Sequence, residues 1–307
     1  MDQEGAHMGD AQRLGVDWTQ QQWGTIDAAV ASEVKRVRVV ERMIPTTKVG
    51  ANDKTVAVDR IDALTRTIDD VTTIPLPEIS VRFLLDKQQV QQPELTRALS
   101  LARRAASDFA RIEDEVLLRG LAFVANAYRP DGRALPRHAD IQRGQDRADY
   151  DGLAGSARNV AYGPRRQSHQ VVNATGGVSD YGHLIVSAVA EAIVILEAAG
   201  HMGPYHLILG RDAFIAALTP NAPTLVLPKD QIEPLLASPI RRSPALDAEE
   251  GVLVSVGGDP ADRVVAVEPT LRFIETTAQD QYRFRVYGVL AMRRKEPEAA
   301  VRLLFPP

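Results

Sequence analysis

The chain has 307 residues, of which 45% are hydrophobic and 25% charged, and its formal net charge is -4. This balance is typical of a globular protein with one large domain or two moderate ones, and it excludes a disordered chain. The sequence has no cysteine, which excludes disulfides, thiolate metal sites and cysteine nucleophiles. No apolar run reaches the ~18 residues of a membrane span. The slightly acidic charge also argues against a surface that condenses nucleic acid.

Residues 1–17 are expected to be a flexible N-terminus, and they show no basic segment followed by an apolar core, so no secretory signal is predicted. With the absence of cysteine, this favours a cytoplasmic location. Residues 18–36 predict a helix, because apolar residues recur there at helical spacing. Its apolar face consists of Trp23, Ile26, Val30 and Val34.

Residues 37–90 predict an extended β-arm with little core of its own. The pattern is strand-like but is interrupted by the turn residues Pro45, Gly50, Asn52 and Asp53. An isolated two-stranded arm is marginally stable in water. Two interpretations remain open: a hairpin packed on its own domain, and an arm that packs on a neighbouring subunit.

Residues 91–127 predict a long helix with one continuous apolar stripe, which Pro93 precedes and Gly120 closes. At ~1.5 Å per residue it spans roughly 40 Å. The stripe consists of Leu95, Leu99, Ala102, Ala106, Phe109, Ile112 and Val116.

An acidic run, Glu113-Asp114-Glu115, lies near the end of this helix. Consecutive helical residues point about 100° apart, so these carboxylates cannot form the facing pair of acid–base catalysis. A solvated or salt-bridged face is expected instead, with Arg119 one turn beyond Glu115 for an ion pair.

Residues 128–150 show no periodicity and are rich in Arg, Asp, Gln, Gly and Pro, which indicates a flexible, solvated loop. An alternative is that basic residues there and nearby meet an anion or an acidic partner. These residues are Arg137, His138, Arg143, Arg165 and Arg166.

The rest of the chain predicts segregated helices and strands, and therefore an α+β fold. Helices are expected over residues 181–199, 212–218 and 230–237. Strands are expected over residues 205–209, 252–256, 263–267, 272–276, 282–292 and 299–305.

Motifs of catalysis are absent from the sequence. The six histidines show no close metal-ligand spacing, and there is no phosphate-binding loop, dinucleotide fingerprint or nucleophile elbow. We therefore predict no enzymatic activity, no metal site and no catalytic residue.

Four segments resemble, in the same order, the encapsulins, which are bacterial and archaeal shell proteins built on the tailed-phage (Hong Kong 97-type) capsid fold. They are residues 19–27 (TQQQWGTID), 109–115 (FARIEDE) followed by Arg119-Gly120, 203–212 (GPYHLILGRD) and 297–301 (PEAAV). The resemblance covers nearly the whole chain.

The resemblance implies a division of the chain into the parts of a capsid subunit. Residues 18–36 would be the N-terminal helix, 37–90 the extended arm, 91–127 the spine helix of the peripheral domain, 128–150 an insertion loop, 151–181 a return segment, 182–265 the apical domain and 266–307 the C-terminal strands of the peripheral domain. The family passes quickly from the spine helix to a Gly-Leu motif, here Gly152-Leu153-Ala154-Gly155, so the insertion of roughly thirty residues is a departure from its pattern.

The resemblance also implies a function: many copies would assemble into an icosahedral compartment that encloses a cargo protein, such as a peroxidase or a ferritin-like protein, through a C-terminal peptide of the cargo. The implied docking residues are Trp23, Ile26, Val30, Val34 and, less directly, Val37. The alternative for these residues is that they form the core face of their helix, and for Trp23 that alternative is preferred.

The apical tip, Thr219-Pro220-Asn221-Ala222-Pro223, would border a pore at a symmetry axis, and its small uncharged residues predict little charge selectivity. Some members hold a flavin with an aromatic residue after a Phe-x-Leu strand. Here that position reads Asp86-Lys87-Gln88, so we predict no flavin or other cofactor.

Two other functions remain as alternatives. One is a prophage major capsid protein of the same fold that packages DNA, although the first helix begins by Trp18 and leaves no long scaffolding segment before it. The other is a soluble monomeric enzyme with an unrecognised site.

Overall fold

The structure is a computed structural model that describes residues 15–62, 67–121, 124, 138–142, 150–155, 170–173, 181–220 and 225–305. Its helices are α2 (Gln20–Val37), α3 (Lys87–Val90), α4 (Thr96–Arg119), α6 (Tyr181–Ala198), α7 (Arg211–Ala217) and α8 (Pro228–Ile232). Its strands are β1 (Thr46–Lys48), β2 (Thr55–Ala57), β3 (Arg60–Asp62), β4 (Thr67–Asp69), β5 (Thr73–Pro75), β6 (Glu78–Asp86), β7 (Ala139–Gln142), β8 (Gln170–Asn173), β9 (Tyr205–Leu209), β10 (Arg241–Arg242), β11 (Glu250–Ser255), β12 (Ala261–Thr276), β13 (Gln281–Arg294) and β14 (Ala300–Leu304).

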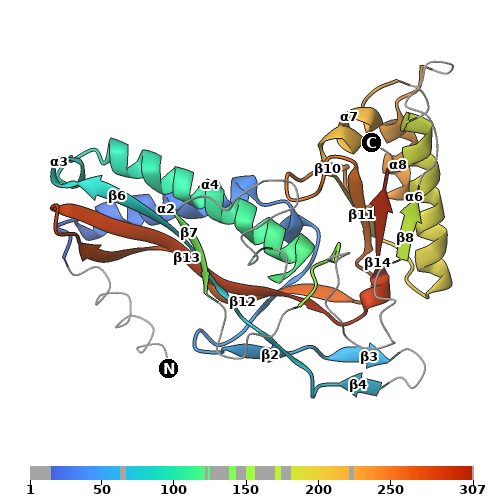
Figure 1. The fold of residues 1–307 in the computed structure, drawn as a ribbon, viewed down its shortest axis with the longest axis horizontal. Helices are drawn as coiled ribbons and strands as arrows, with labels where there is room; N and C mark the ends of the chain where they lie inside the picture. The colour runs from blue at the N-terminus through green and yellow to red at the C-terminus, as the bar shows by residue number, and fades with distance from the viewer. Residues whose placement is uncertain are drawn as a thin grey trace.

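A five-stranded sheet in the order β1-β12-β13-β6-β7 carries α2 and α4 on one face (Figure 1). Val81 of β6 lies opposite Val286 of β13, and Phe83 lies opposite Phe284. Because side chains alternate along a strand, these residues all point to the face that the two helices cover. Phe109 of α4 and Phe284 are fully buried in this core. The apolar stripe predicted for the long helix is therefore the surface that packs on the sheet.

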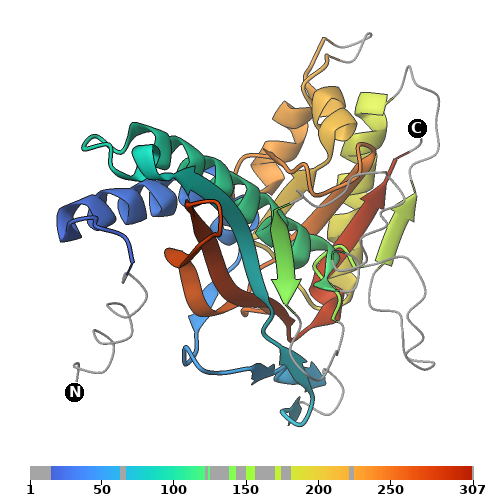
Figure 2. The same cartoon turned by 60° about the vertical axis from the view of Figure 1, so that its left-hand side comes forward.

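The second unit is a five-stranded sheet in the order β10-β9-β11-β14-β8, with α6, α7 and α8 packed on it (Figures 1 and 2). The terminal strand, expected among the strands of the peripheral domain, lies in this sheet instead. It pairs antiparallel with β11 and parallel with β8. The physical reason is burial: Val301 and Leu303 are fully buried in the core of this second unit.

Strand β12 also differs from expectation, because residues 263–267 and 272–276 belong to one strand of 16 residues rather than two. The pairing of β12 with β13 changes register twice between Val265 and Thr270, a stretch that contains Pro269. Proline cannot donate a ladder hydrogen bond, so a bulge is where a strand tolerates it.

The segment 128–150, expected to be a loop, contains a strand. Residues 139–142 form β7, which pairs antiparallel with Glu78–Val81 of β6. Four residues are too few for a period to be recognised from sequence, and the strand forms because β6 would otherwise leave backbone groups unpaired at a sheet edge. Apart from His138 and Tyr150, the rest of this segment lies outside the described residues.

The extended arm is a two-stranded hairpin in which β2 pairs with β5 and β3 with β4. Figures 1 and 2 both show it projecting below the two sheets. Two apolar side chains near its tip are exposed, Ile68 to 65% and Val71 to 85%. Nothing within the described part of the chain covers them.

The C-terminus of α4 ends in a close backbone crossing. Gly120 adopts φ +91°, and the N–H groups of Leu153 and Ala154 donate to the carbonyls of Leu117 and Leu118 at 2.9 and 2.7 Å. The last helical carbonyls, which have no partner inside the helix, are satisfied in this way. At Gly152 the crossing leaves no space for a side chain, since a Cβ would lie 2.4 Å from a backbone atom of Leu118.

We therefore expect Gly152→Ala to destabilise the fold by at least about 3 kcal/mol, because the clash is with backbone that cannot turn aside. Gly24→Ala is the matched control. A Cβ at Gly24 on α2 meets nothing within 4 Å, and alanine in a helix should add about 0.5–1 kcal/mol. Chemical denaturation of both variants measures the two effects, and a tolerated Gly152→Ala would contradict the crossing.

Candidate functional site

Helix α2 is fixed at its N-terminus by a capping box, in which Thr19 and Gln22 each accept from the other's backbone N–H. The Trp18 indole N–H donates to the Val90 carbonyl at 2.8 Å. The rings of Trp18 and Phe284 stack with centroids 5.1 Å apart, and Trp23 meets Trp18 edge to face at 4.9 Å. These contacts hold α2 against the first sheet.

The predicted docking residues lie on the core side of α2. Trp23, Ile26, Val30 and Val34 are at most 3% exposed, and all four belong to the main hydrophobic core, while Val37 is half-buried against it. In the single chain these side chains are already packed. A peptide that docks on α2 must therefore use another face of the helix.

Beyond the first turn, which exposes Gln20 and Gln21, the outward face of α2 is made of small side chains. The small exposed residues are Gly24, Thr25, Ala28, Ala31 and Ser32. Lys35 and Arg36 are exposed at the C-terminal end of the same helix, where Arg36 pairs with Glu33 at 2.6 Å. The face is a shallow, nearly uncharged strip with cations at one end.

The C-terminal end of α2 is anchored by two arginines that follow it. The guanidinium of Arg42 donates to the carbonyls of Lys35 and Arg36, at 2.8 and 3.2 Å. Arg38, only 5% exposed, donates through Nε to the Glu113 carboxylate of α4 at 2.7 Å. Cations at a helix C-terminus also interact favourably with the helix dipole.

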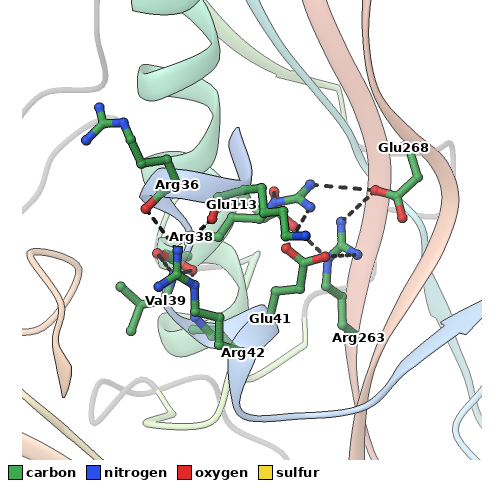
Figure 3. Close-up of polar contacts among 11 residues, drawn as sticks. Arg36, Arg38, Val39, Glu41, Arg42, Glu113, Arg263 and Glu268 are labelled. Carbon is green, nitrogen blue, oxygen red and sulfur yellow. Dashed lines mark hydrogen bonds and ion pairs between the residues drawn. The ribbon is translucent and has the colours of Figure 1, made fainter. Parts of the chain in front are cut away.

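Glu113 lies between two guanidinium groups (Figure 3). Arg263 of β12 donates to its second carboxylate oxygen at 2.6 Å, and both Glu113 and Arg263 are fully buried. Glu41 and Glu268 complete the cluster around Arg38 and Arg263. Burial raises the pKa of Glu113, and the two arginines oppose that rise. One carboxylate thus joins α2, α4 and β12.

Asp114 caps the short helical turn that follows α2. Its carboxylate accepts the backbone N–H groups of Val39 at 2.9 Å and Val40 at 3.1 Å. Burial raises the pKa of Asp114 to about 7, although the Val40 N–H hydrogen bond favours the ionised form. The neighbouring negative charge of Glu113 adds to the rise.

The solvated interpretation of the acidic run was therefore wrong for Glu113 and Asp114, which are 0% and 2% exposed. The salt-bridged interpretation is confirmed for Glu113, but its partners lie 75 and 150 residues away along the chain. Arg119 ion-pairs with Glu250 of the second sheet at 2.5 Å. Helical spacing alone gives no signal for such distant partners.

Of the predicted apical tip, the structure describes Thr219 and Pro220, which are exposed. The Thr219 hydroxyl donates to the Ile215 carbonyl at 2.9 Å, so it belongs to the end of α7. Asn221, Ala222 and Pro223 lie outside the described residues.

In the part of the chain that the structure describes, no group of three or more His, Asp or Glu side chains is arranged to hold a metal ion. Within the same residues, no helix is both long and apolar enough to cross a membrane. Asp86, which precedes α3, forms a capping box with Gln89.

The model of one protein family, described as "Encapsulating protein for peroxidase" (Linocin_M18), matches residues 8–125 and 165–291 of the chain. The chain belongs to the encapsulin family. The fold agrees with the resemblance, because the chain superposes on a solved virus-like particle and a solved capsid over most of its length.

Individual relatives are distant. The type 1 encapsulin shell protein EncA of Myxococcus xanthus (strain DK1622) is 29% identical over 116 residues, and the match spans 38% of this chain and 40% of that protein. The virus-like particle of Pyrococcus furiosus superposes with a TM-score of 0.65 at 15% identity, covering 92% of this chain and 98% of the other. The capsid of an empty GTA particle superposes with a TM-score of 0.56 at 17% identity, covering 87% and 89%.

The raised pKa of Asp114 predicts a specific pH dependence. Below about pH 4 the Asp114 carboxyl is protonated in both the folded and the unfolded chain, so its contribution to the free energy of unfolding is fully present. As the pH rises toward 7 the unfolded chain ionises first, and about 4 kcal/mol of stability is lost. Relative to Asp114→Asn, the free energy of unfolding of the wild type should therefore fall between pH 4 and 7 and then level off.

Glu33→Gln serves as the control, because the hydrogen bond from Arg36 lowers the pKa of Glu33. Its difference from the wild type should run the opposite way, with stability lost as the pH falls. Denaturant titrations at several pH values measure both differences. A wild-type to Asp114→Asn difference that stays constant from pH 4 to 7 would mean that Asp114 is ionised throughout.

Proposed function

We propose that this chain is a shell subunit, many copies of which assemble into a closed icosahedral compartment in the cytoplasm and enclose a cargo protein such as a peroxidase or a ferritin-like protein. Membership of the encapsulin family carries this proposal. The fold supports it, since two solved structures on which the chain superposes form a virus-like particle and a capsid.

The arm supplies a contact for assembly. A two-stranded hairpin alone in water is only marginally stable. Exposed apolar side chains at its tip contribute stabilising free energy only when another surface buries them. Ile68 and Val71 are such side chains. We propose that a neighbouring subunit covers them, and that repetition of modest contacts of this kind stabilises the closed shell.

The cargo contact is proposed for the outward face of α2. Its small residues leave room for an extended peptide to lie close to the helix backbone, whereas Trp23, Ile26, Val30 and Val34 hold the helix in place from beneath. The exposed Lys35 and Arg36 favour a peptide with an acidic group at that end. We further propose that the tip at residues 219–223 borders a pore.

The assembly proposal predicts that Ile68→Lys with Val71→Lys prevents shell formation, because charges at the arm tip resist burial at a contact. Size-exclusion chromatography and negative-stain microscopy should show uniform hollow particles for the wild type and small, folded species for the double variant. Ser100→Lys, an exposed position on α4, is the control and should still form particles. A wild type that remains monomeric at high concentration would exclude the shell function.

The cargo proposal predicts that Ala28→Arg abolishes cargo loading while shells still form, because a long side chain then occupies the outward face of α2. The measurement is co-purification of a co-expressed peroxidase or ferritin-like cargo protein. Ser100→Arg is the control and should load cargo as the wild type does. Equal loading in all three shells would place the docking surface elsewhere.

A further inference from the structure

The face of the first sheet that α2 and α4 leave uncovered carries a row of arginines. Arg272 of β12 lies directly opposite Arg285 of β13, and Arg285 lies directly opposite Arg82 of β6. Arg283 precedes Arg285 by two residues on β13, so the two side chains lie on the same face of the sheet. Like charges directly opposite each other destabilise a sheet unless negative charges offset them.

These side chains surround a hollow. A cavity of about 480 Å³ is lined by Arg82, Arg272, Phe273, Ile274, Arg283 and Arg285. All four arginines therefore reach one space, which has two apolar residues at its border. The space is larger than one small anion, so an anion there would share it with water.

Carboxylates offset three of the four charges. Arg82 pairs with Asp140 at 3.0 Å, Arg283 with Glu275 and Arg285 with Glu78. Arg272 is different, because no carboxylate of the described residues lies within ion-pair distance of it. Burial lowers the pKa of Arg272 and the neighbouring charge of Arg285 lowers it further, while the more distant carboxylate of Glu78 opposes the shift.

The floor of this face also holds hydroxyl groups with no partner. The guanidiniums of Arg272 and Arg285 lie over the Tyr287 ring, 4.0 and 4.8 Å from its centroid. Tyr287 is 2% exposed and Ser80, opposite it on β6, is 0% exposed. Among the described residues neither hydroxyl has a hydrogen-bond partner, and both residues lie beneath the hollow rather than in its lining. Buried polar groups of this kind usually have one.

We propose that this hollow, the arginine hollow, binds a small oxyanion with the chemistry of phosphate. A guanidinium presents two parallel N–H donors that match two oxygens of a tetrahedral anion. An anion there would supply the negative charge that Arg272 lacks and would reduce the repulsion along the row. The site uses neither the arm nor α2, so it stands independently of the proposed shell function.

Arg272→Gln is the decisive variant, because it removes one guanidinium of the hollow without breaking an ion pair that the structure shows. Isothermal titration of the purified full chain with inorganic phosphate, at constant ionic strength, measures the affinity. We expect the wild type to bind and Arg272→Gln to bind at least tenfold more weakly. Arg242→Gln, an exposed arginine on β10 of the other sheet, is the matched control and should bind as the wild type does.

Thermal unfolding gives a second measure. Phosphate should raise the Tm of the wild type and of Arg242→Gln by a few degrees and leave that of Arg272→Gln unchanged. Without phosphate, Arg272→Gln removes both a repulsion with Arg285 and the contact with the Tyr287 ring, so the Tm of each protein with phosphate is compared with its own Tm without phosphate. No binding by the wild type, or equal binding by all three proteins, would overturn the proposal whether or not the chain forms shells.

Discussion

The architecture depends on one buried carboxylate held between two arginines. Glu113 has no access to water, and Arg38 and Arg263 reach its two oxygens from α2 and from β12. Removing one member of such a cluster leaves a buried charge uncompensated, which costs about 3–5 kcal/mol. A second carboxylate repeats the arrangement: Glu250, also buried, accepts from Arg119 at the end of α4 and from Arg302 of β14. The spine helix α4 is thus tied at one point to α2 and at another to the second sheet.

Apolar burial and buried ion pairs stabilise this fold in different ways. The stripe of α4 supplies much of the apolar burial, but apolar contacts are non-directional and specify the position of a helix on a sheet less sharply than hydrogen-bonded charges do. Ion pairs with fixed geometry do not, because each guanidinium must meet particular oxygens. In the first unit Phe109 and Phe284 provide burial, while Glu113 fixes the position of α4 along the sheet.

The sequence predicted those parts of the fold whose cause is local. The helices α2 and α4 follow from apolar spacing, and β9 over residues 205–209 follows from a short apolar run. The family was predicted from four short segments. What could not be predicted depends on partners far apart in the chain. The place of β14 depends on β11 and β8, and the burial of Glu113 depends on two arginines, neither of which differs locally from a surface arginine.

The exposed face of α2, the candidate docking surface, was also not predicted from the sequence. The apolar residues of α2 were easy to recognise, and the structure places Trp23, Ile26, Val30 and Val34 in the core. The outward face consists of small residues that have no period of their own, so a pattern search passes over them. The sequence therefore predicts the helix, whereas only the structure shows which of its faces is exposed to solvent.

The position of β14 bears on how the chain is made. In the second sheet this strand lies between β11, about fifty residues earlier, and β8, about one hundred and thirty residues earlier. A ribosome must therefore synthesise residue 304 before the second sheet can join β8 to β11. Until then both strands have open edges, so the second unit of a growing chain cannot take its final shape. Synthesis itself then sets the order of events: a chain presents its completed second unit to other copies only after its last described strand has emerged.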